Sequence, residues 1–289
     1  MQKDVCIIGA GMAGLCAGTY LQMNGYRTRI FELHKLPGGL CTSWKRKGYT
    51  FDGCIHYLVG SSPPHSYYKF WNELIDMSAI DWVDHETILD IDVPGPEGRT
   101  IFHFYSDIDR QEQYMKELAP EDSKMIDRMS AAARLLQKHE FPPASERPSE
   151  LATIVDWLGW LTVVPILPTL IGWGGTSNFQ FADKLKNPIL KTVFERIFEG
   201  EEFPMLILSM QQAWFDARIA GYPVGGSLAF AQRFADRFES MGGEIEYGAK
   251  VEEILVEGDR AVGLRLSDGT EHRCEDVISA ADGHFTLFG

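Results

Sequence analysis

Asp4-Val-Cys-Ile-Ile-Gly-Ala-Gly-Met-Ala-Gly14 begins as a run of strand-forming residues and leads directly into three spaced glycines. Residues 15–24 are typical of a helix that ends at Gly25, and a second apolar run over residues 28–31 ends on Glu32. A strand, a glycine-rich turn, a helix, a second strand and an acid in this order make up the dinucleotide-binding fingerprint. The alternative is a glycine-rich turn in an α/β sheet that binds no ligand.

The glycines of this turn each have a physical reason. Gly9 allows the tight turn after the first strand, Gly11 has no Cβ to keep a pyrophosphate from the backbone, and Gly14 lets the helix pack closely on the sheet. The helix N-terminus presents free N–H groups and a partial positive charge to the phosphates. Glu32 is placed to accept hydrogen bonds from the adenosine ribose, and its charge disfavours the 2′-phosphate of NADP. The expected nucleotide contacts are therefore Gly9, Ala10, Gly11, Met12, Ala13, Gly14 and Glu32.

A glycine pair follows the acid and favours FAD over NAD. The segment Pro37-Gly38-Gly39-Leu40 resembles the glycine-pair extension of the two-dinucleotide-binding-domain flavoproteins. That superfamily includes amine oxidases, phytoene desaturases, carotenoid isomerases and retinol saturases. The resemblance implies that Gly38, Gly39 and Leu40 lie against the flavin-side phosphate and the ribitol. An ordinary surface turn is the alternative for these residues.

A second motif, residues 49–58, is similar to the segment that runs beside the flavin in this superfamily. Phytoene desaturases and retinol saturases have a Phe-Asp pair like Phe51-Asp52, and retinol saturases also have a His-Tyr pair like His56-Tyr57. His56 is thus the candidate for contact with flavin or substrate, and a hydrogen-bonded, partly buried histidine is the alternative. No catalytic base is assigned, because the resemblance implies that the flavin carries the redox chemistry.

Composition excludes several other classes of function. The chain has 289 residues and a net charge of −14, which argues against a nucleic-acid partner because phosphate contacts need clustered Lys and Arg. The five cysteines show neither a CxxC pair nor a metal-ligand spacing, so we expect no metal site and reduced thiols in a cytoplasmic protein. The first apolar run is already the first strand, so no signal peptide is expected.

The middle of the chain changes in character from α/β to mixed α and β. Residues 87–93 and 99–105 are predicted to form a hairpin, because Pro94 and Gly98 bound the turn between two strand-like runs. The predicted helices are 66–77, one from Asp107 onwards, Pro120 to about 139, 177–186, 189–199 and Pro204 to 218, with the two before Pro204 separated by Pro188.

Trp157–Trp173 is an uncharged stretch that Pro165 and Pro168 interrupt. It is too short for a comfortable transmembrane helix. Three interpretations remain open: a core segment, part of an apolar substrate channel, or a patch that dips into a membrane surface.

The last part of the chain, Gly221 to Asp282, resembles the phytoene desaturases and carotenoid isomerases. They share the Tyr-Pro-x-Gly-Gly loop seen here at residues 222–226, a helix, a strand with a valine, and a small-residue turn after the returning strand. The resemblance implies that Val251 holds the adenine through its backbone; a buried strand valine is the alternative.

The fold class that these motifs predict is α/β: a Rossmann-like FAD-binding domain with an inserted, mixed α+β substrate domain. We expect the FAD-binding domain to comprise residues 1–80 and 218–289, and the substrate domain to comprise residues 81–217. The implied function is an FAD-dependent oxidoreductase acting on an apolar isoprenoid or polyene substrate, in the cytoplasm or at a membrane. Amine oxidation and an incomplete, non-catalytic FAD-binding fragment are the alternatives.

The resemblance covers nearly all of this chain but only about the first half of a usual family member. The late glycine-rich segment that closes the flavin end of the site in that family has no counterpart after Asp282. We therefore expect residues 1–289 alone to bind FAD weakly, to turn over little substrate and to aggregate unless a second chain completes the fold.

Overall fold

The computed structural model describes residues 3–95, 98–139, 149–151, 153, 158 and 160–288. They form two compact units that the chain enters more than once. Unit 1 comprises Met1–Leu58, Lys69–Trp82 and Tyr222–Gly289, and unit 2 comprises Val59–Tyr68 and Val83–Gly221. The chain passes between the units at Leu58–Val59, Tyr68–Lys69, Trp82–Val83 and Gly221–Tyr222. Three of these positions lie in the short strands β5 (Leu58–Val59), β6 (Trp82–Val83) and β9 (Ala220–Pro223).

A four-stranded parallel sheet organises unit 1. Its strands are β1 (Asp4–Ile8), β2 (Arg27–Glu32), β10 (Glu244–Tyr247) and β14 (Asp276–Ser279), in the order β10-β2-β1-β14. Ile7 at the centre aligns with Ile30 on one side and Ile278 on the other. The two strands from the start of the sequence thus lie at the centre, flanked by two strands from its last part, and the expected Rossmann-like α/β fold is confirmed.

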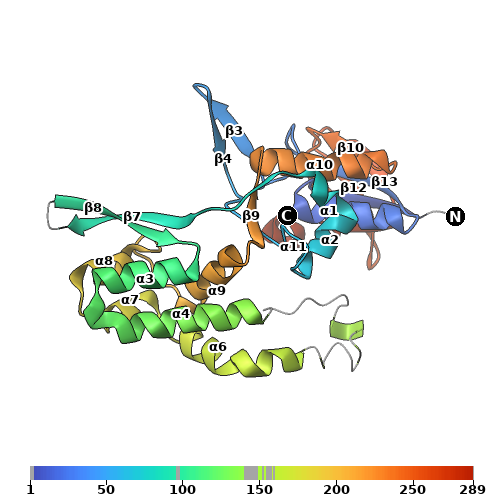
Figure 1. Ribbon diagram of the computed structural model, residues 1–289. Coiled ribbons are helices and arrows are strands. Elements are labelled where there is room, and N and C mark those ends of the chain that lie inside the picture. The colour runs from blue at the N-terminus through green and yellow to red at the C-terminus, as the bar shows by residue number, and fades with distance from the viewer. Residues whose placement is uncertain are drawn as a thin grey trace. The chain divides into compact units, whose positions relative to one another are not determined.

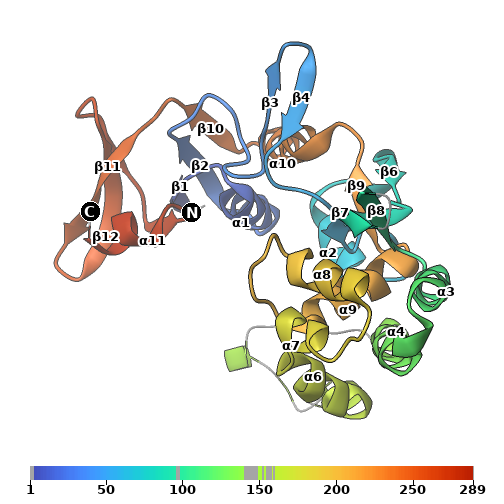
Figure 2. The same cartoon turned by 90° about the vertical axis from the view of Figure 1, so that its left-hand side faces the viewer.

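Two helices of unit 1 pack against each other beside this sheet (Figure 2). They are α1 (Met12–Met23) and α10 (Gly226–Ser240). A Cβ on Gly18 of α1 would lie 2.8 Å from the ring of Phe238 of α10, so the absence of a side chain there sets how closely the helices approach. α2 (Tyr67–Leu74) adds Trp71, whose ring lies edge-on to Phe230 and Phe234 of α10.

The rest of unit 1 consists of short elements. An antiparallel sheet combines β11 (Val251–Glu257), β12 (Arg260–Leu266) and β13 (Glu271–Arg273), and β3 (Ser43–Arg46) pairs with β4 (Tyr49–Asp52) as a hairpin. The remaining elements are η1 (Met77–Ala79) and α11 (Gly283–Phe288).

Unit 2 is a hairpin packed on helices (Figure 1). The hairpin is β7 (Thr87–Gly95) with β8 (Gly98–Tyr105), close to the predicted strands. The helices are α3 (Ile108–Leu118), α4 (Ser123–Lys138), α6 (Leu167–Gly174), α7 (Asn178–Ala182), α8 (Pro188–Arg196) and α9 (Met205–Asp216), with the 3-10 turns η2 (Pro120–Asp122), η3 (Ser149–Leu151) and η4 (Trp160–Ile166). Buried Phe102, Phe104, Phe181 and Phe194 form its core. The two short helices predicted on either side of Pro188 are present as α7 and α8, and α8 begins at Pro188 itself because a proline fits the first helical position and Asn187 caps it.

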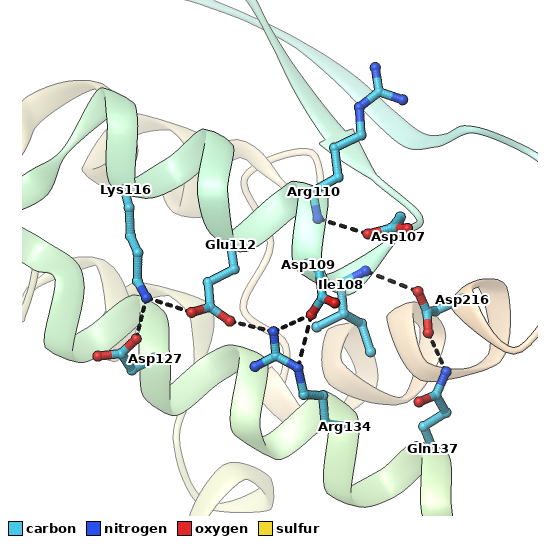
Figure 3. A network of polar contacts seen from close by, with 10 residues as sticks. All are labelled: Asp107, Ile108, Asp109, Arg110, Glu112, Lys116, Asp127, Arg134, Gln137 and Asp216. Carbon is cyan, nitrogen blue, oxygen red and sulfur yellow. Dashed lines mark hydrogen bonds and ion pairs between the residues drawn. The ribbon is translucent and has the colours of Figure 1, made fainter.

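Charged side chains join α3 to α4 on the surface of this unit (Figure 3). Arg134 pairs with Asp109 at 2.5 Å and with Glu112 at 2.6 Å. Lys116 pairs with Glu112 and with Asp127, each at 2.5 Å. Glu112 therefore lies between two cations.

The uncharged stretch 157–173 is only partly a core segment. Trp157 and Gly159 lie outside the described residues. Val163 and Ile166 are buried, whereas Leu161, Val164 and Ile171 are more than half exposed. Among the described residues, no helix combines the length and apolar character needed to cross a bilayer.

Candidate cofactor-binding site

The glycine turn connects β1 to α1 with no space for larger residues at its two ends. Gly9 donates its N–H to the carbonyl of Phe31 at 2.8 Å and has φ +96°. A Cβ on Gly14 would lie 2.0 Å from the carbonyl oxygen of Gly9. Ala280 closes the turn from the end of β14, since a Cβ on Gly9 would lie 3.2 Å from its carbonyl oxygen. Ala280 was not among the residues predicted for the site, although the small residues that follow β14 indicate a close approach of the backbone there.

Gly11 differs from Gly9 and Gly14, because neither its backbone conformation nor a neighbouring atom requires a glycine at this position. Its φ of −66° is one that any residue adopts, and a Cβ built there meets no atom within 4 Å. Gly11 is also the N-cap of α1, and no side chain caps this helix or places a negative charge in its first turn. The first N–H groups of α1, at Met12 and Ala13, therefore receive no cap side chain, and an uncapped helix N-terminus suits an anion.

The glycine pair lies directly on this turn. Gly38 donates its N–H to the carbonyl of Ala10 at 2.7 Å and forms a β-bridge with Gly11. A Cβ on Gly39 would lie 3.2 Å from the Cα of Gly11. Residues 38–39 thus border the open space beside Gly11, while the side chain of Leu40 points into solvent and is 87% exposed.

Glu32 is buried at the end of β2 with its carboxylate held by backbone groups. One oxygen accepts the N–H of Ala10 at 2.6 Å and the other accepts the N–H of His34 at 2.7 Å. These bonds tie the acid to the glycine turn, a role that the sequence did not reveal. Each carboxylate oxygen keeps a further acceptor position, which a ribose hydroxyl can use.

Val251 reaches the same end of the sheet from the last part of the chain. Ala249 donates its N–H to the carbonyl of Glu32 at 2.9 Å, and Val251 begins β11 two residues later. Its side chain is buried in a cluster with Ile8 and Phe31, as expected for a strand valine. Its proposed adenine contact uses the backbone, which this burial leaves unchanged.

The environment of His56 differs from that of Glu32 and Val251, which are buried. Its ring is exposed, and it has no hydrogen-bond partner among the described residues, so the alternative of a hydrogen-bonded, partly buried histidine is wrong. The carboxylate of nearby Asp52 accepts hydrogen bonds from the hydroxyl of Tyr222 at 2.7 Å and from the N–H of Ser227 at 2.8 Å. Burial, with the hydrogen bond to Asp52, raises the pKa of Tyr222 to about 12.

The residues present fit a flavin dinucleotide. A helix N-terminus without a cap, a glycine with free space where its Cβ would be, and a buried acid next to it are the features that a nucleotide pyrophosphate and ribose need. No group of three or more metal-ligating side chains occurs among the described residues.

Two family models match the chain. Residues 7–74 match an NAD(P)-binding Rossmann-like domain, and residues 178–284 match the flavin-containing amine oxidoreductases. The second match supports FAD as the cofactor. Relatives in sequence confirm the resemblance to retinol saturases and phytoene desaturases.

Three relatives illustrate the similarity. An all-trans-retinol 13,14-reductase of Homo sapiens is 28% identical over 96% of this chain and 47% of its own length. A protein of Danio rerio named inactive all-trans-retinol 13,14-reductase is 28% identical over 99% and 48%. The neurosporene-forming phytoene desaturase of Rhodobacter capsulatus is 27% identical over 96% and 52%. The chain thus spans about half the length of the curated relatives it matches.

Solved structures agree on the fold. A putrescine oxidase with bound putrescine superposes with a TM-score of 0.55 at 17% identity, over 97% of this chain and 58% of the other. An oxidoreductase from Methanosarcina mazei gives a TM-score of 0.53 at 21% identity, over 96% and 58%.

Proposed function

We propose, from the similarity of this chain to retinol reductases and phytoene desaturases, that it carries the nucleotide-binding part of an FAD-dependent oxidoreductase whose substrate is an apolar polyene or isoprenoid. The observation that carries this proposal is the open space beside Gly11, bordered by the N-terminus of α1 and the pair Gly38-Gly39. A glycine without strain and without a neighbour has its simplest explanation in a ligand that occupies the space.

The residues of this site have distinct proposed roles. The N–H groups of α1 and the backbone at Gly11 bind the pyrophosphate, and the helix dipole offsets part of its charge. Glu32 accepts the ribose hydroxyls and repels a 2′-phosphate, while the backbone of Val251 holds the adenine. FAD, when bound, supplies hydride chemistry, and the protein supplies orientation and exclusion of water.

Substrate handling is assigned to unit 2, following the domain division that the sequence predicts. The relatives named for retinol and phytoene take apolar, conjugated substrates. The exposed side chains of Leu161, Val164 and Ile171 offer apolar surface for such a molecule, or for a lipid surface that contains it. Contact with a membrane surface through η4 and α6 is therefore part of the proposal.

The cofactor assignment is tested with two variants that each replace a glycine by valine. Gly11→Val places a side chain in the open space, so FAD affinity should fall at least tenfold while the unfolding midpoint stays within a few degrees. Gly172→Val in α6 serves as a control for the substitution itself, since its Cβ also meets no atom within 4 Å and its φ lies outside the left-handed region. Titration calorimetry with FAD and thermal unfolding of the apoprotein give the two readings. Unchanged FAD affinity in Gly11→Val would remove the assignment.

Substrate class is tested by binding rather than turnover. Retinol and putrescine are titrated separately into the FAD-loaded protein, with flavin absorbance and intrinsic fluorescence as signals. The proposal expects saturable retinol binding and no response to putrescine. Saturable putrescine binding without retinol binding would favour amine oxidation, the alternative that the sequence left open.

A further inference from the structure

An apolar hollow lies among α4, α6 and α7 of unit 2, and none of the residues that line it is assigned to the cofactor. Its volume is about 600 Å³, and its walls include Ala132 and Leu135 of α4, Trp173 of α6 and Phe181 of α7. A volume between about 300 and 1,000 Å³ with mostly apolar walls is typical of small-molecule sites.

Two basic side chains, Arg128 and Lys184, line the hollow beside its apolar residues. A second hollow of about 800 Å³ adjoins it and shares Met125, Arg128 and Lys184 with it. Four basic side chains line these two hollows: Lys124, Arg128, Lys184 and Lys186. None of the four side chains forms an ion pair or a hydrogen bond with the residues that the structure describes.

The nearby acids do not neutralise these cations, because they are engaged elsewhere. Asp122 is buried and accepts the backbone N–H groups of Lys186 and Asn187. Glu121 and Asp127 also line the second hollow; Glu121 accepts the side-chain N–H of Asn187 at 3.0 Å, and Asp127 pairs with Lys116 at 2.5 Å. Unpaired cations gathered at one place are unexpected in a chain with a net charge of −14, where an excess of acids is available to pair with them.

We propose that this hollow binds a long-chain fatty acid, with the aliphatic chain against Leu135, Trp173 and Phe181 and the carboxylate between Arg128 and Lys184. An apolar cavity explains the chain, and cations without partners explain the charge of the head group. The site goes beyond the proposed oxidoreductase function, because an uncharged polyene has no group that would pair with these cations.

The experiment uses the full chain without added FAD, so that its outcome is independent of the cofactor site. Oleate is titrated below its critical micelle concentration by calorimetry, and oleyl alcohol is titrated in parallel. Oleate should bind with one site and at least tenfold more tightly than the alcohol. The double variant Arg128→Gln/Lys184→Gln should weaken oleate binding roughly tenfold, the scale of two partly exposed ion pairs, and leave the alcohol unchanged.

Two further variants distinguish binding in the hollow from an effect of the protein's overall charge. Lys191→Gln removes the same charge from a lysine that pairs with Asp183 at 3.0 Å outside the hollow, and it should leave oleate binding unchanged. Gly172→Phe adds a large apolar side chain at a lining residue of α6 where a Cβ meets no atom within 4 Å, and it should abolish binding of both ligands.

Several outcomes would overturn the inference. Equal affinity for oleate and oleyl alcohol would show that the cations do not recognise the head group. Unchanged oleate binding in the double variant or in Gly172→Phe would place the ligand elsewhere. Binding to vesicles of anionic phospholipid without binding of monomeric oleate would assign the same cations to a membrane surface instead.

Discussion

The carboxylate of Asp52 accepts the hydroxyl hydrogen of Tyr222 at 2.7 Å, across 170 positions of sequence. The same carboxylate accepts the N–H of Ser227, at the start of α10, and Ser227 in turn accepts the N–H of Ile55 through its hydroxyl at 2.8 Å. Two motifs that the sequence showed only as separate resemblances, the Phe-Asp pair and the Tyr-Pro-x-Gly-Gly loop, are therefore one hydrogen-bonded structure. Asp52 acts as a cap that a distant segment supplies to α10.

Asp52→Asn should destabilise unit 1 by about 1–2 kcal/mol, since it removes a negative charge from a helix N-terminus and weakens the bond to Tyr222. Urea unfolding monitored by circular dichroism measures the change. Asp259→Asn, in the exposed turn between β11 and β12, is the matched control and should change stability by less than about 0.5 kcal/mol. Equal effects of the two substitutions would contradict the capping role.

Substitution of Gly14 by alanine should strongly lower the unfolding temperature, whereas the same substitution at Gly11 should hardly change it. Gly14→Ala places a Cβ 2.0 Å from the carbonyl oxygen of Gly9 and should prevent stable folding or lower the unfolding temperature strongly. Gly11→Ala meets no protein atom and should leave the unfolding temperature nearly unchanged. Thermal unfolding of the two apoproteins compares them directly. A strong loss of stability in Gly11→Ala would mean that the space beside it is structurally required.

Glu32→Ala should weaken both folding and FAD binding, each by about 1–3 kcal/mol, because the carboxylate holds the N–H groups of Ala10 and His34. Glu32→Gln keeps one acceptor oxygen and should recover part of the stability. Glu32→Arg should reduce FAD affinity more than the alanine does, since it introduces a bulky cation at a buried position. Unfolding in urea and calorimetric titration with FAD separate the two effects, and unchanged FAD affinity in Glu32→Ala and Glu32→Arg would exclude the ribose contact.

The stability that Glu112 contributes to unit 2 should be lost in acid. Burial favours its neutral form, but the hydrogen bonds from Lys116 and Arg134 outweigh burial and lower the pKa of the carboxyl below its usual value. A carboxyl with a lowered pKa in the folded state contributes stability at neutral pH that is lost as the pH falls through that lowered value. Glu112→Gln should therefore cost about 1 kcal/mol at pH 7, and this cost should shrink as the pH falls through the lowered pKa of Glu112.

The measurement for Glu112 is the difference in unfolding free energy between wild type and variant at several pH values. Glu117→Gln on the same helix provides the control, because Glu117 bonds the neutral Gln113 and not a cation. A difference at Glu112 that does not vary between pH 3 and pH 7 would show that its ion pairs contribute nothing.

Much of the cofactor site was predictable from short stretches of sequence. The turn at residues 9–14 and the acid at Glu32 follow from local rules, since a tight turn, a helix N-terminus and a strand end are set by adjacent residues. The hairpin at residues 87–105 followed in the same way from two strand-like runs and the turn between them. The helix predicted from Ile189 begins one residue earlier, at Pro188, in line with the local preference of proline for the first helical position.

The Rossmann-like βαβ unit and the chemistry of its glycine turn could be predicted from the amino-acid sequence, because both depend on residues close together in the chain. The contacts between distant segments emerged only in the folded protein: Ala280 against Gly9, Glu32 bonded to Ala10, Asp52 bonded to Tyr222, and unpaired cations beside the apolar hollow of unit 2. Such contacts depend on how helices and strands pack. A sequence pattern shows which faces are apolar or charged, but the packing selects which faces meet.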